Sequence, residues 1–229
     1  VPWLESAVSM ARGNCRFIAV SEATAAQWRP RVDARVVHNG VHPDRWPVGP
    51  GGPRALWSGR LVPEKAPHQA LLAARRAGMP LDLVGPVGDP AYVEAQVRPL
   101  LDRSTGPSTD SEACYRYLGH LGQRELARTV GRACVAVLTP AWEEPFGLVA
   151  VEALSTGTPV AAYARGALPE ILGPTTGRLA IPDDPDSLAT AMRDAAGLDR
   201  AGVRAGAAAF GLPAMVDAYE QLYAEAVGD

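Results

Sequence analysis

Two basic residues follow closely after a short apolar run of the sequence. Ala55–Ser58 is predicted to be a strand, and Arg60 and Lys65 come after it, five positions apart, in a loop that contains Pro63. In an open parallel sheet, ligands bind just beyond the carboxyl ends of the strands. Arginine offers a planar fork and lysine a compact charge, which together suit a diphosphate. Lys65 is also the only lysine among 22 basic residues. The alternative is that both are ordinary surface charges.

A second group combines two carboxylates with a helix start. The predicted strand Val135–Leu138 precedes Glu144, and Pro145 is predicted to begin a helix at the position that proline prefers. The free amides of residues 146–148 would then form an anion site. Glu152 follows Glu144 by eight positions, slightly over two helical turns, so both carboxylates can face one cleft. Carboxylates suit a ribose diol or sugar hydroxyls, although a helix-capping charge and a solvated helix face are the alternatives.

Two weaker signals fall at the same predicted edge of the sheet. Gly166–Glu170 follows the predicted strand Pro159–Tyr163 and contains a helix-starting proline. Gly119 and His120 follow another predicted strand, Tyr115–Leu118. His120 could contact a base or a sugar, although a lone histidine at a strand end is more often a surface residue. The histidines and cysteines have no spacing typical of a metal site.

These strand ends require a sheet that positions them. Short runs rich in apolar residues predict seven strands: Arg16–Val20, Arg35–His38, Ala55–Ser58, Leu81–Gly85, Tyr115–Leu118, Val135–Leu138 and Pro159–Tyr163. Helices are predicted between and after them: Glu22–Trp28, His68–Ala77, Ala91–Asp102, Gln123–Ala133, Phe146–Ser155, a helical tail from Ser187, and Pro213–Val227. This alternation predicts an α/β fold with a doubly wound, Rossmann-like parallel sheet.

The clearest break in the pattern is Pro47–Pro53, where seven residues include three prolines and three glycines. This composition predicts a linker or hinge. The preceding segment, 1–46, is too short for an independent domain and is interpreted as the C-terminal edge of a domain whose beginning is absent. Residues 54–211 are predicted to form the main domain and 212–229 a C-terminal helix. Arg103–Ala113 is predicted to be a mobile surface loop.

Composition narrows the class of protein. The 229 residues include 22 basic and 25 acidic side chains, a net charge of −3 with neutral histidine, and 47% are hydrophobic. The high apolar fraction and small net charge exclude an intrinsically disordered protein and argue against a nucleic-acid-binding surface. No apolar run approaches the roughly 20 residues of a membrane-spanning helix. Three widely spaced cysteines, Cys15, Cys114 and Cys134, are interpreted as buried thiols in a reducing compartment, which indicates a cytoplasmic protein.

Together these motifs resemble glycosyltransferase family 4. The resemblance rests on stretches that occur in the family's order: His38–Val41, Gly59–Lys65, the Glu-x7-Glu pair Glu144 and Glu152 around Pro-Phe-Gly, Ser155–Val160 and Gly166–Glu170. It implies a GT-B architecture, in which two Rossmann-like domains face each other across a cleft and the C-terminal domain holds a nucleotide-sugar. It also implies a retaining enzyme without a metal, and that most of the acceptor-binding N-terminal domain is absent here. The chain departs from the family at Gly85–Gly88, where a tighter Gly-x-Gly is usual.

The resemblance implies a role for each candidate residue. The catalytic residues would act on the diphosphate and the donor sugar: Arg60, Lys65 and Glu144. The nucleotide-sugar site would add the amides at the helix start, the ribose-binding carboxylate and two residues against the base: Phe146, Gly147, Leu148, Val149, Glu152, Gly119 and His120. Whether Glu144 acts as a nucleophile or the acceptor proton passes to the donor phosphate stays open.

The function expected from the resemblance is transfer of a hexose, with retained configuration, from a nucleoside-diphosphate sugar to an unidentified acceptor hydroxyl. The donor would be a UDP-sugar by default, and no cofactor is expected. The alternative is a non-catalytic nucleotide-sugar-binding module. A dinucleotide oxidoreductase is disfavoured because no strand precedes Gly-x-Gly-x-x-Gly, and a P-loop NTPase because Glu64 precedes Lys65. Asp183–Asp186 resembles a metal-binding Asp-x-Asp, but capping of the helix from Ser187 explains it better.

Overall fold

The computed structural model describes residues 6, 8–11, 15–102 and 114–228. The surface loop predicted at Arg103–Ala113 lies outside the described residues. Within the described ranges, no helix is both long and apolar enough to cross a bilayer.

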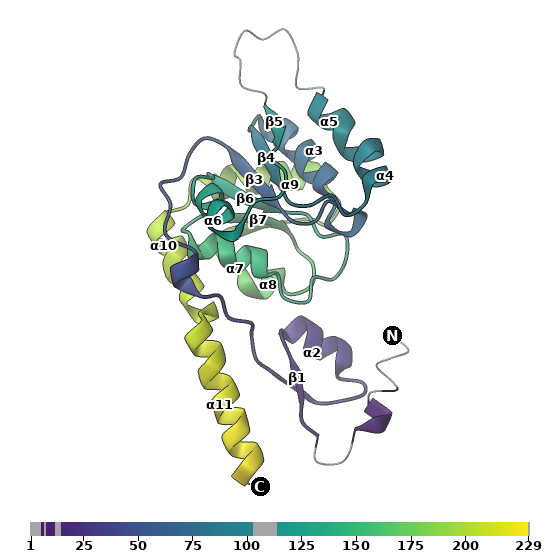
Figure 1. Cartoon of the computed structure of the whole chain (residues 1–229), viewed down its shortest axis with the longest axis vertical. Coiled ribbons are helices and arrows are strands. Elements are labelled where there is room, and N and C mark those ends of the chain that lie inside the picture. The colour runs from purple at the N-terminus through teal and green to yellow at the C-terminus, as the bar shows by residue number, and fades with distance from the viewer. Residues whose placement is uncertain (1–5, 7, 12–14, 103–113, 229) are drawn as a thin grey trace.

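A six-stranded parallel sheet forms the centre of the larger part of the molecule (Figure 1). Its spatial order is β5-β4-β3-β6-β7-β8. The bounds are Ala55–Ser58 for β3, Leu81–Val84 for β4, Tyr115–Tyr117 for β5, Val135–Leu138 for β6, Val160–Tyr163 for β7 and Gly177–Ala180 for β8. From β3 the chain proceeds to one edge through β4 and β5, then returns to pair β6 with β3 and proceeds to the other edge. The sheet therefore has a topological switch point between β3 and β6, where open α/β sheets bind ligands.

Helices cover both faces of this sheet, as the alternation of strands and helices predicted. Alternate side chains of each strand point to opposite faces, so Trp57 belongs to one hydrophobic core and its neighbour Leu56 to the other. The first core lies under α3 (Pro67–Ala77) and α9 (Pro185–Ala196). The second lies under a further set of helices: α6 (Gln123–Gly131), α7 (Leu148–Ser155), α8 (Leu168–Ile171) and α10 (Arg200–Gly206).

The helix predicted over Ala91–Asp102 forms in three pieces. It consists of α4 (Pro90–Tyr92), a π-helical turn η3 (Val93–Val97) and α5 (Arg98–Asp102). Pro99 gives a physical reason for the interruption, because proline has no amide hydrogen and its ring collides with the carbonyl four residues earlier.

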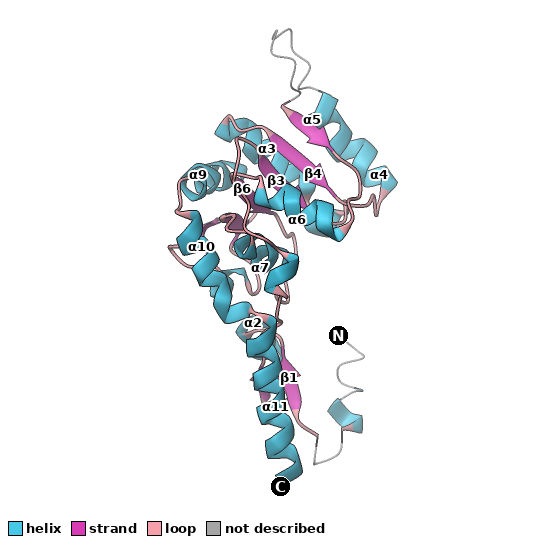
Figure 2. Cartoon of the chain, turned by 60° about the vertical axis from the view of Figure 1, so that its left-hand side comes forward, coloured by secondary structure: helices cyan, strands magenta, loops and turns pink. Residues whose placement is uncertain are grey.

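The N-terminal part and the C-terminal helix lie side by side. The N-terminal part consists of β1 (Phe17–Ala19), α2 (Glu22–Trp28) and β2 (Ala34–Val36), with β1 and β2 parallel. The long helix α11 (Leu212–Gly228) follows η4 (Ala207–Phe210) and extends away from the sheet domain on the same side as β1 (Figure 2). An ion pair between Arg35 and Glu225 joins β2 to this helix.

The predicted linker is irregular but bound to the sheet domain. After η1 (Pro43–Arg45), the amide of Gly49 donates to the Thr156 carbonyl at 3.0 Å and the amide of Gly51 to the Gly131 carbonyl at 2.9 Å. A Cβ on Gly49 would lie 2.1 Å from the Gly131 carbonyl oxygen. The segment therefore lies against the ends of α6 and α7.

Three further differences separate the sequence analysis from the structure. Strand β8 was not predicted, because its four residues include Arg178 and lie at the sheet edge. Cys15 and Cys114 are exposed, so the interpretation of all three cysteines as buried thiols was wrong. The helix predicted to begin at Pro145 begins at Leu148. The capping prediction is confirmed, since the Asp184 carboxylate accepts hydrogen bonds from the first amides of α9.

Candidate functional site

A cavity of about 350 Å³ lies at the topological switch point. Two lining residues, Val20 and Asn39, come from the N-terminal part. The others come from the ends of β3 and β6, the loops that follow these strands and the start of α7: Trp57, Ser58, Gly59, Lys65, Leu138, Thr139, Pro140, Trp142, Glu144, Pro145, Phe146, Gly147, Leu148 and Val149. The two stretches in which the sequence predicted chemistry therefore meet in one cavity.

Thr139 fixes the backbone that carries Lys65. The Thr139 hydroxyl is buried directly after β6, and lies 2.9 Å from the Lys65 carbonyl oxygen and 3.0 Å from that of Ala66, which accept its proton. In turn it accepts a 3.0 Å hydrogen bond from the Trp57 indole. The amide of Ala141 donates to the Glu64 carbonyl at 2.9 Å. These bonds join the loop after β3, including η2 (Pro63–Lys65), to the loop after β6.

Lys65 and Glu144 form an ion pair inside the cavity lining. The Lys65 Nζ lies 2.5 Å from the Glu144 Oε2, and their side chains are 27% and 15% exposed. The same ammonium lies 5.2 Å from the centre of the Trp142 ring, a distance at which a cation is attracted to the ring face. The lysine that the sequence singled out is therefore held between a carboxylate and an aromatic ring.

The loop that carries Glu144 is attached to the start of α8. The amide of Gly166 donates to the Glu143 carboxylate at 2.7 Å, and the amide of Ala167 donates to the Glu144 carbonyl at 2.9 Å. Gly166 has φ +55°, and a Cβ there would lie 2.1 Å from the Glu144 carbonyl oxygen. A glycine is thus required at this position, which gives the Gly166–Glu170 motif a structural role beside Glu144.

Gly147 forms the N-cap of α7 at φ +90°. The left-handed backbone turns the chain into the helix, so the first helical residues are Leu148 and Val149 instead of Pro145. The first amides of a helix have no partner within it, and both of these residues line the cavity. The residues at the start of α7 therefore line the cavity, and the helix begins one turn later than the proline suggested.

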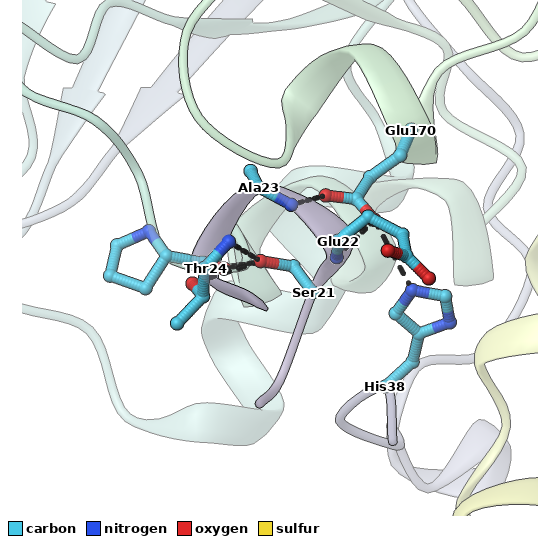
Figure 3. A network of polar contacts seen from close by, with 7 residues as sticks. Ser21, Glu22, Ala23, Thr24, His38 and Glu170 are labelled. Atoms are coloured by element: carbon cyan, nitrogen blue, oxygen red, sulfur yellow. Dashed lines mark hydrogen bonds and ion pairs between the residues drawn. The ribbon is translucent and has the colours of Figure 1, made fainter. Parts of the chain in front are cut away.

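The N-terminal part is connected to the same loop. The Ser21 hydroxyl donates to the Pro145 carbonyl at 2.6 Å, and the Thr24 hydroxyl approaches the same oxygen at 3.2 Å. Figure 3 shows Glu170 of α8 reaching the amides of Glu22 and Ala23 at the start of α2.

A histidine completes this network. The His38 Nε2 lies 3.4 Å from the Glu170 carboxylate (Figure 3). Its ring also packs near the rings of Phe146 and Phe210, at centroid distances of 5.9 and 5.5 Å. The loop before α7 is therefore fixed from two sides, by α8 and by the segment that precedes the sheet domain.

The structure brings most but not all of the predicted residues together. Those that line the cavity are Lys65, Glu144, Phe146, Gly147, Leu148 and Val149. Those outside its lining are Arg60, Gly119, His120 and Glu152. Arg60 is exposed directly after the lining residue Gly59.

Gly119 and His120 lie at the same carboxyl edge of the sheet, two strands away from β3. The amide of Gly59 donates to the Val84 carbonyl, and the amide of Gly85 donates to the Gly119 carbonyl, each at 2.9 Å. Gly85 has φ +141°, and a Cβ there would lie 1.8 Å from the Gly59 carbonyl oxygen. The first glycine of Gly85–Gly88 thus allows the ends of β3 and β4 to touch.

Several lining residues were not predicted as site residues: Val20, Asn39, Trp57, Thr139 and Trp142. Thr139 carried a usable signal, because a hydroxyl directly after a buried strand lies at the ligand-binding edge. Val20 and Asn39 lie over 90 residues from Glu144 in sequence, and only tertiary packing brings them to the cavity.

Glu152 lies on α7 beside the cavity rather than in its lining. Burial raises the pKa of its carboxyl to about 7, and among the described residues no hydrogen bond or ion pair to it is found. Because the folded protein binds this proton more tightly than the unfolded chain, stability falls as pH rises from about 4.5 to 7 and stays low above that range.

We expect Glu152→Gln to stabilise the protein at pH 8 by about 1–3 kcal/mol and hardly at pH 4.5, since glutamine carries no charge to bury. Urea unfolding at the two pH values measures the difference. An equal gain at both would contradict the assignment of the penalty to the buried charge.

The parallel sheet, its switch point and this cavity define a Rossmann-like ligand-binding domain. The sequence model for the family "Glycosyl transferases group 1" matches residues 42–209, and the chain belongs to that family. The matched range includes the six-stranded sheet and nearly all of the cavity lining.

Relatives with assigned names agree with this family. The chain is 35% identical over 170 residues to a glycogen synthase of Mycobacterium tuberculosis, covering 69% of this chain and 38% of that protein. It is 30% identical to a D-inositol 3-phosphate glycosyltransferase of Streptomyces griseus, covering 85% of this chain and 49% of that protein. The chain thus spans less than half the length of these curated relatives.

Solved structures show the same fold. AviGT4, a glycosyltransferase involved in avilamycin A biosynthesis, has 26% identity and a TM-score of 0.77, covering 93% of this chain and 64% of that one. Anabaena HepE, solved with UDP and glucose, has 21% identity and a TM-score of 0.79, covering 97% of this chain and 66% of that one.

Proposed function

We propose that this chain provides the donor site of a retaining glycosyltransferase, which moves a hexose from a nucleoside-diphosphate sugar to an acceptor hydroxyl. The observation that supports the proposal is the cavity at the switch point, whose lining includes Lys65, Glu144 and the first residues of α7. A cation and helix amides suit a diphosphate, and a neighbouring carboxylate suits sugar hydroxyls.

The diphosphate is the group whose charge changes most during this reaction. As the bond from the sugar to the donor phosphate breaks, negative charge develops on the departing diphosphate. Cations and hydrogen-bond donors of the protein that are already in place stabilise this developing charge more than they stabilise the bound substrate. We assign this role to Lys65 and to the amides of Leu148 and Val149. Arg60 is assigned as a second cation, because its exposed side chain directly follows the lining residue Gly59.

The nucleoside and the sugar occupy opposite sides of the diphosphate in this proposal. Glu144 accepts from the sugar hydroxyls and Glu152 from the ribose diol, while the base lies against Gly119 and His120. UDP is taken as the default nucleoside diphosphate. No metal or other cofactor is part of the proposed site, since the cation and the amides supply the charge that a divalent ion would otherwise provide.

The first test is stabilisation by the donor's nucleotide. A nucleoside diphosphate at a hundredfold over its dissociation constant is expected to raise the free energy of unfolding by about 2.7 kcal/mol. Urea unfolding with UDP, GDP or ADP, each with EDTA present, measures this gain. No stabilisation by any of the three contradicts the proposal, and a gain that EDTA abolishes contradicts its metal-free form.

A second measurement separates the enzyme from a binding module. Transfer of the sugar, or hydrolysis of the donor to nucleoside diphosphate and free sugar, supports the enzyme. Binding of the nucleotide-sugar without either reaction, in a protein as long as the curated relatives, supports the non-catalytic nucleotide-sugar-binding module.

A further inference from the structure

The cation assigned to the diphosphate already has an anion in the unliganded protein. Lys65 Nζ is 2.5 Å from Glu144 Oε2, and both side chains are mostly shielded from water. In the described residues, Glu144 is the carboxylate that forms an ion pair with this ammonium, and the centre of the Trp142 ring lies 5.2 Å from it. An arriving phosphate therefore meets a lysine whose charge is neutralised.

The backbones on both sides of this pair are fixed. The Lys65 carbonyl is bonded by Thr139, and the Glu144 carbonyl by the amide of Ala167. The loops themselves are joined by the bond from Ala141 to Glu64. The two side chains are long, so the ion pair can open by rotation about side-chain bonds without moving either loop.

A diphosphate on Lys65 has two ways to bind, and both are opposed by Glu144. If it displaces the carboxylate, the ion pair is lost. If it shares the ammonium, two anions lie within a few ångströms of each other in a partly shielded cavity, where like charges repel strongly. The diphosphate of a free nucleoside diphosphate offers Glu144 nothing in return, because an ionised phosphate has no hydrogen-bond donors and the ribose hydroxyls are assigned to Glu152.

A nucleoside-diphosphate sugar differs in this respect. Its hydroxyl groups lie next to the diphosphate and can donate to the carboxylate that Lys65 releases, so Glu144 exchanges one partner for others. We propose that Glu144 is a specificity-determining residue that discriminates the sugar-bearing donor from the free nucleoside diphosphate product, through its competition for Lys65. This inference rests on the proposed function and deepens it: the same carboxylate holds the donor sugar and promotes release of the product.

The test compares Glu144→Gln with the parent 229-residue chain by isothermal titration calorimetry, using UDP and UDP-glucose. We expect Glu144→Gln to bind UDP about three- to tenfold more tightly, because the amide carries no negative charge to neutralise Lys65 or to repel phosphate. The preference for UDP-glucose over UDP is expected to fall in the same variant. In a transfer assay, UDP is then a stronger product inhibitor of Glu144→Gln than of the parent.

Glu143→Gln is the matched control. It removes the same charge from the neighbouring position, where the carboxylate bonds to the Gly166 amide and not to Lys65. Its affinity for UDP is expected to stay within about twofold of the parent, since exposed charges are screened. Equal tightening in both variants would show a general charge effect and overturn the proposal. Unchanged or weaker UDP binding in Glu144→Gln would also overturn it.

Failure of this inference is distinguishable from failure of the proposed function. If the parent binds UDP and UDP-glucose but Glu144→Gln shows no tightening, the donor site stands and the discrimination by Glu144 does not. If the parent binds none of UDP, GDP and ADP, the donor site itself is contradicted, and the inference is overturned with it.

Discussion

Lys65→Ala is expected to weaken binding of a nucleoside diphosphate by roughly 10- to 150-fold, the range of a hydrogen bond to a charged group. The loss has two physical sources. The ammonium that attracts the phosphate is removed, and Glu144 is left in the cavity without the cation that neutralised it. Isothermal titration calorimetry with UDP measures the loss directly.

The fold itself is expected to tolerate this change. The side chains of the pair are 27% and 15% exposed, so the carboxylate left without its partner keeps some contact with water. The expected loss of stability is about 1–3 kcal/mol, between the values for an exposed and a buried pair. Arg193→Ala on α9 is the charge-matched control, and its UDP affinity is expected to equal that of the parent. An equal loss in both variants would mean that overall charge, and not the position of Lys65, governs binding.

Lys65→Arg tests why lysine occupies this position in a chain otherwise rich in arginine. The guanidinium is larger and planar, and it must fit between Glu144 and the Trp142 ring. We expect Lys65→Arg to retain part of the UDP affinity but to lose sugar transfer. A variant that binds and reacts like the parent would contradict the requirement for a compact ammonium.

Gly166→Ala is the second change with a large expected effect. A Cβ at this position would lie 2.1 Å from the Glu144 carbonyl oxygen, and the backbone has φ +55°. The left-handed conformation and the steric collision together predict a loss of about 2–4 kcal/mol in the free energy of unfolding. Relief of the collision displaces Glu144, so affinity for the donor sugar is expected to fall as well.

Gly173→Ala provides the control for this prediction. Gly173 follows the same short helix α8, but a Cβ there would meet no atom within 4 Å and its φ is not positive. Urea unfolding of the two variants, with UDP-glucose titrations on the folded protein, separates the effects. Equal stability of Gly166→Ala and Gly173→Ala would contradict the close approach of α8 to the Glu144 loop.

The sheet was predictable where strands are apolar throughout. β3 and β6 have the predicted bounds, since both strands are covered on two faces and therefore contain almost only hydrophobic residues. β8 escaped prediction because it is an edge strand whose middle residues, Arg178 and Leu179, are less buried. The start of α7 was misplaced because Pro145 matches a helix start locally, whereas Gly147 makes the actual turn.

The sequence by itself determined the α/β class, the positions of the strand ends and the types of side chain that follow them. These features depend on local periodicity and on residue chemistry. Only the tertiary structure decided which of those side chains share a cavity. Lys65 and Glu144 are 79 positions apart, and they meet because β3 pairs with β6 across the switch point. Arg60 and Glu152 stay outside the lining, because the direction of a side chain depends on how its loop or helix packs rather than on its distance along the chain.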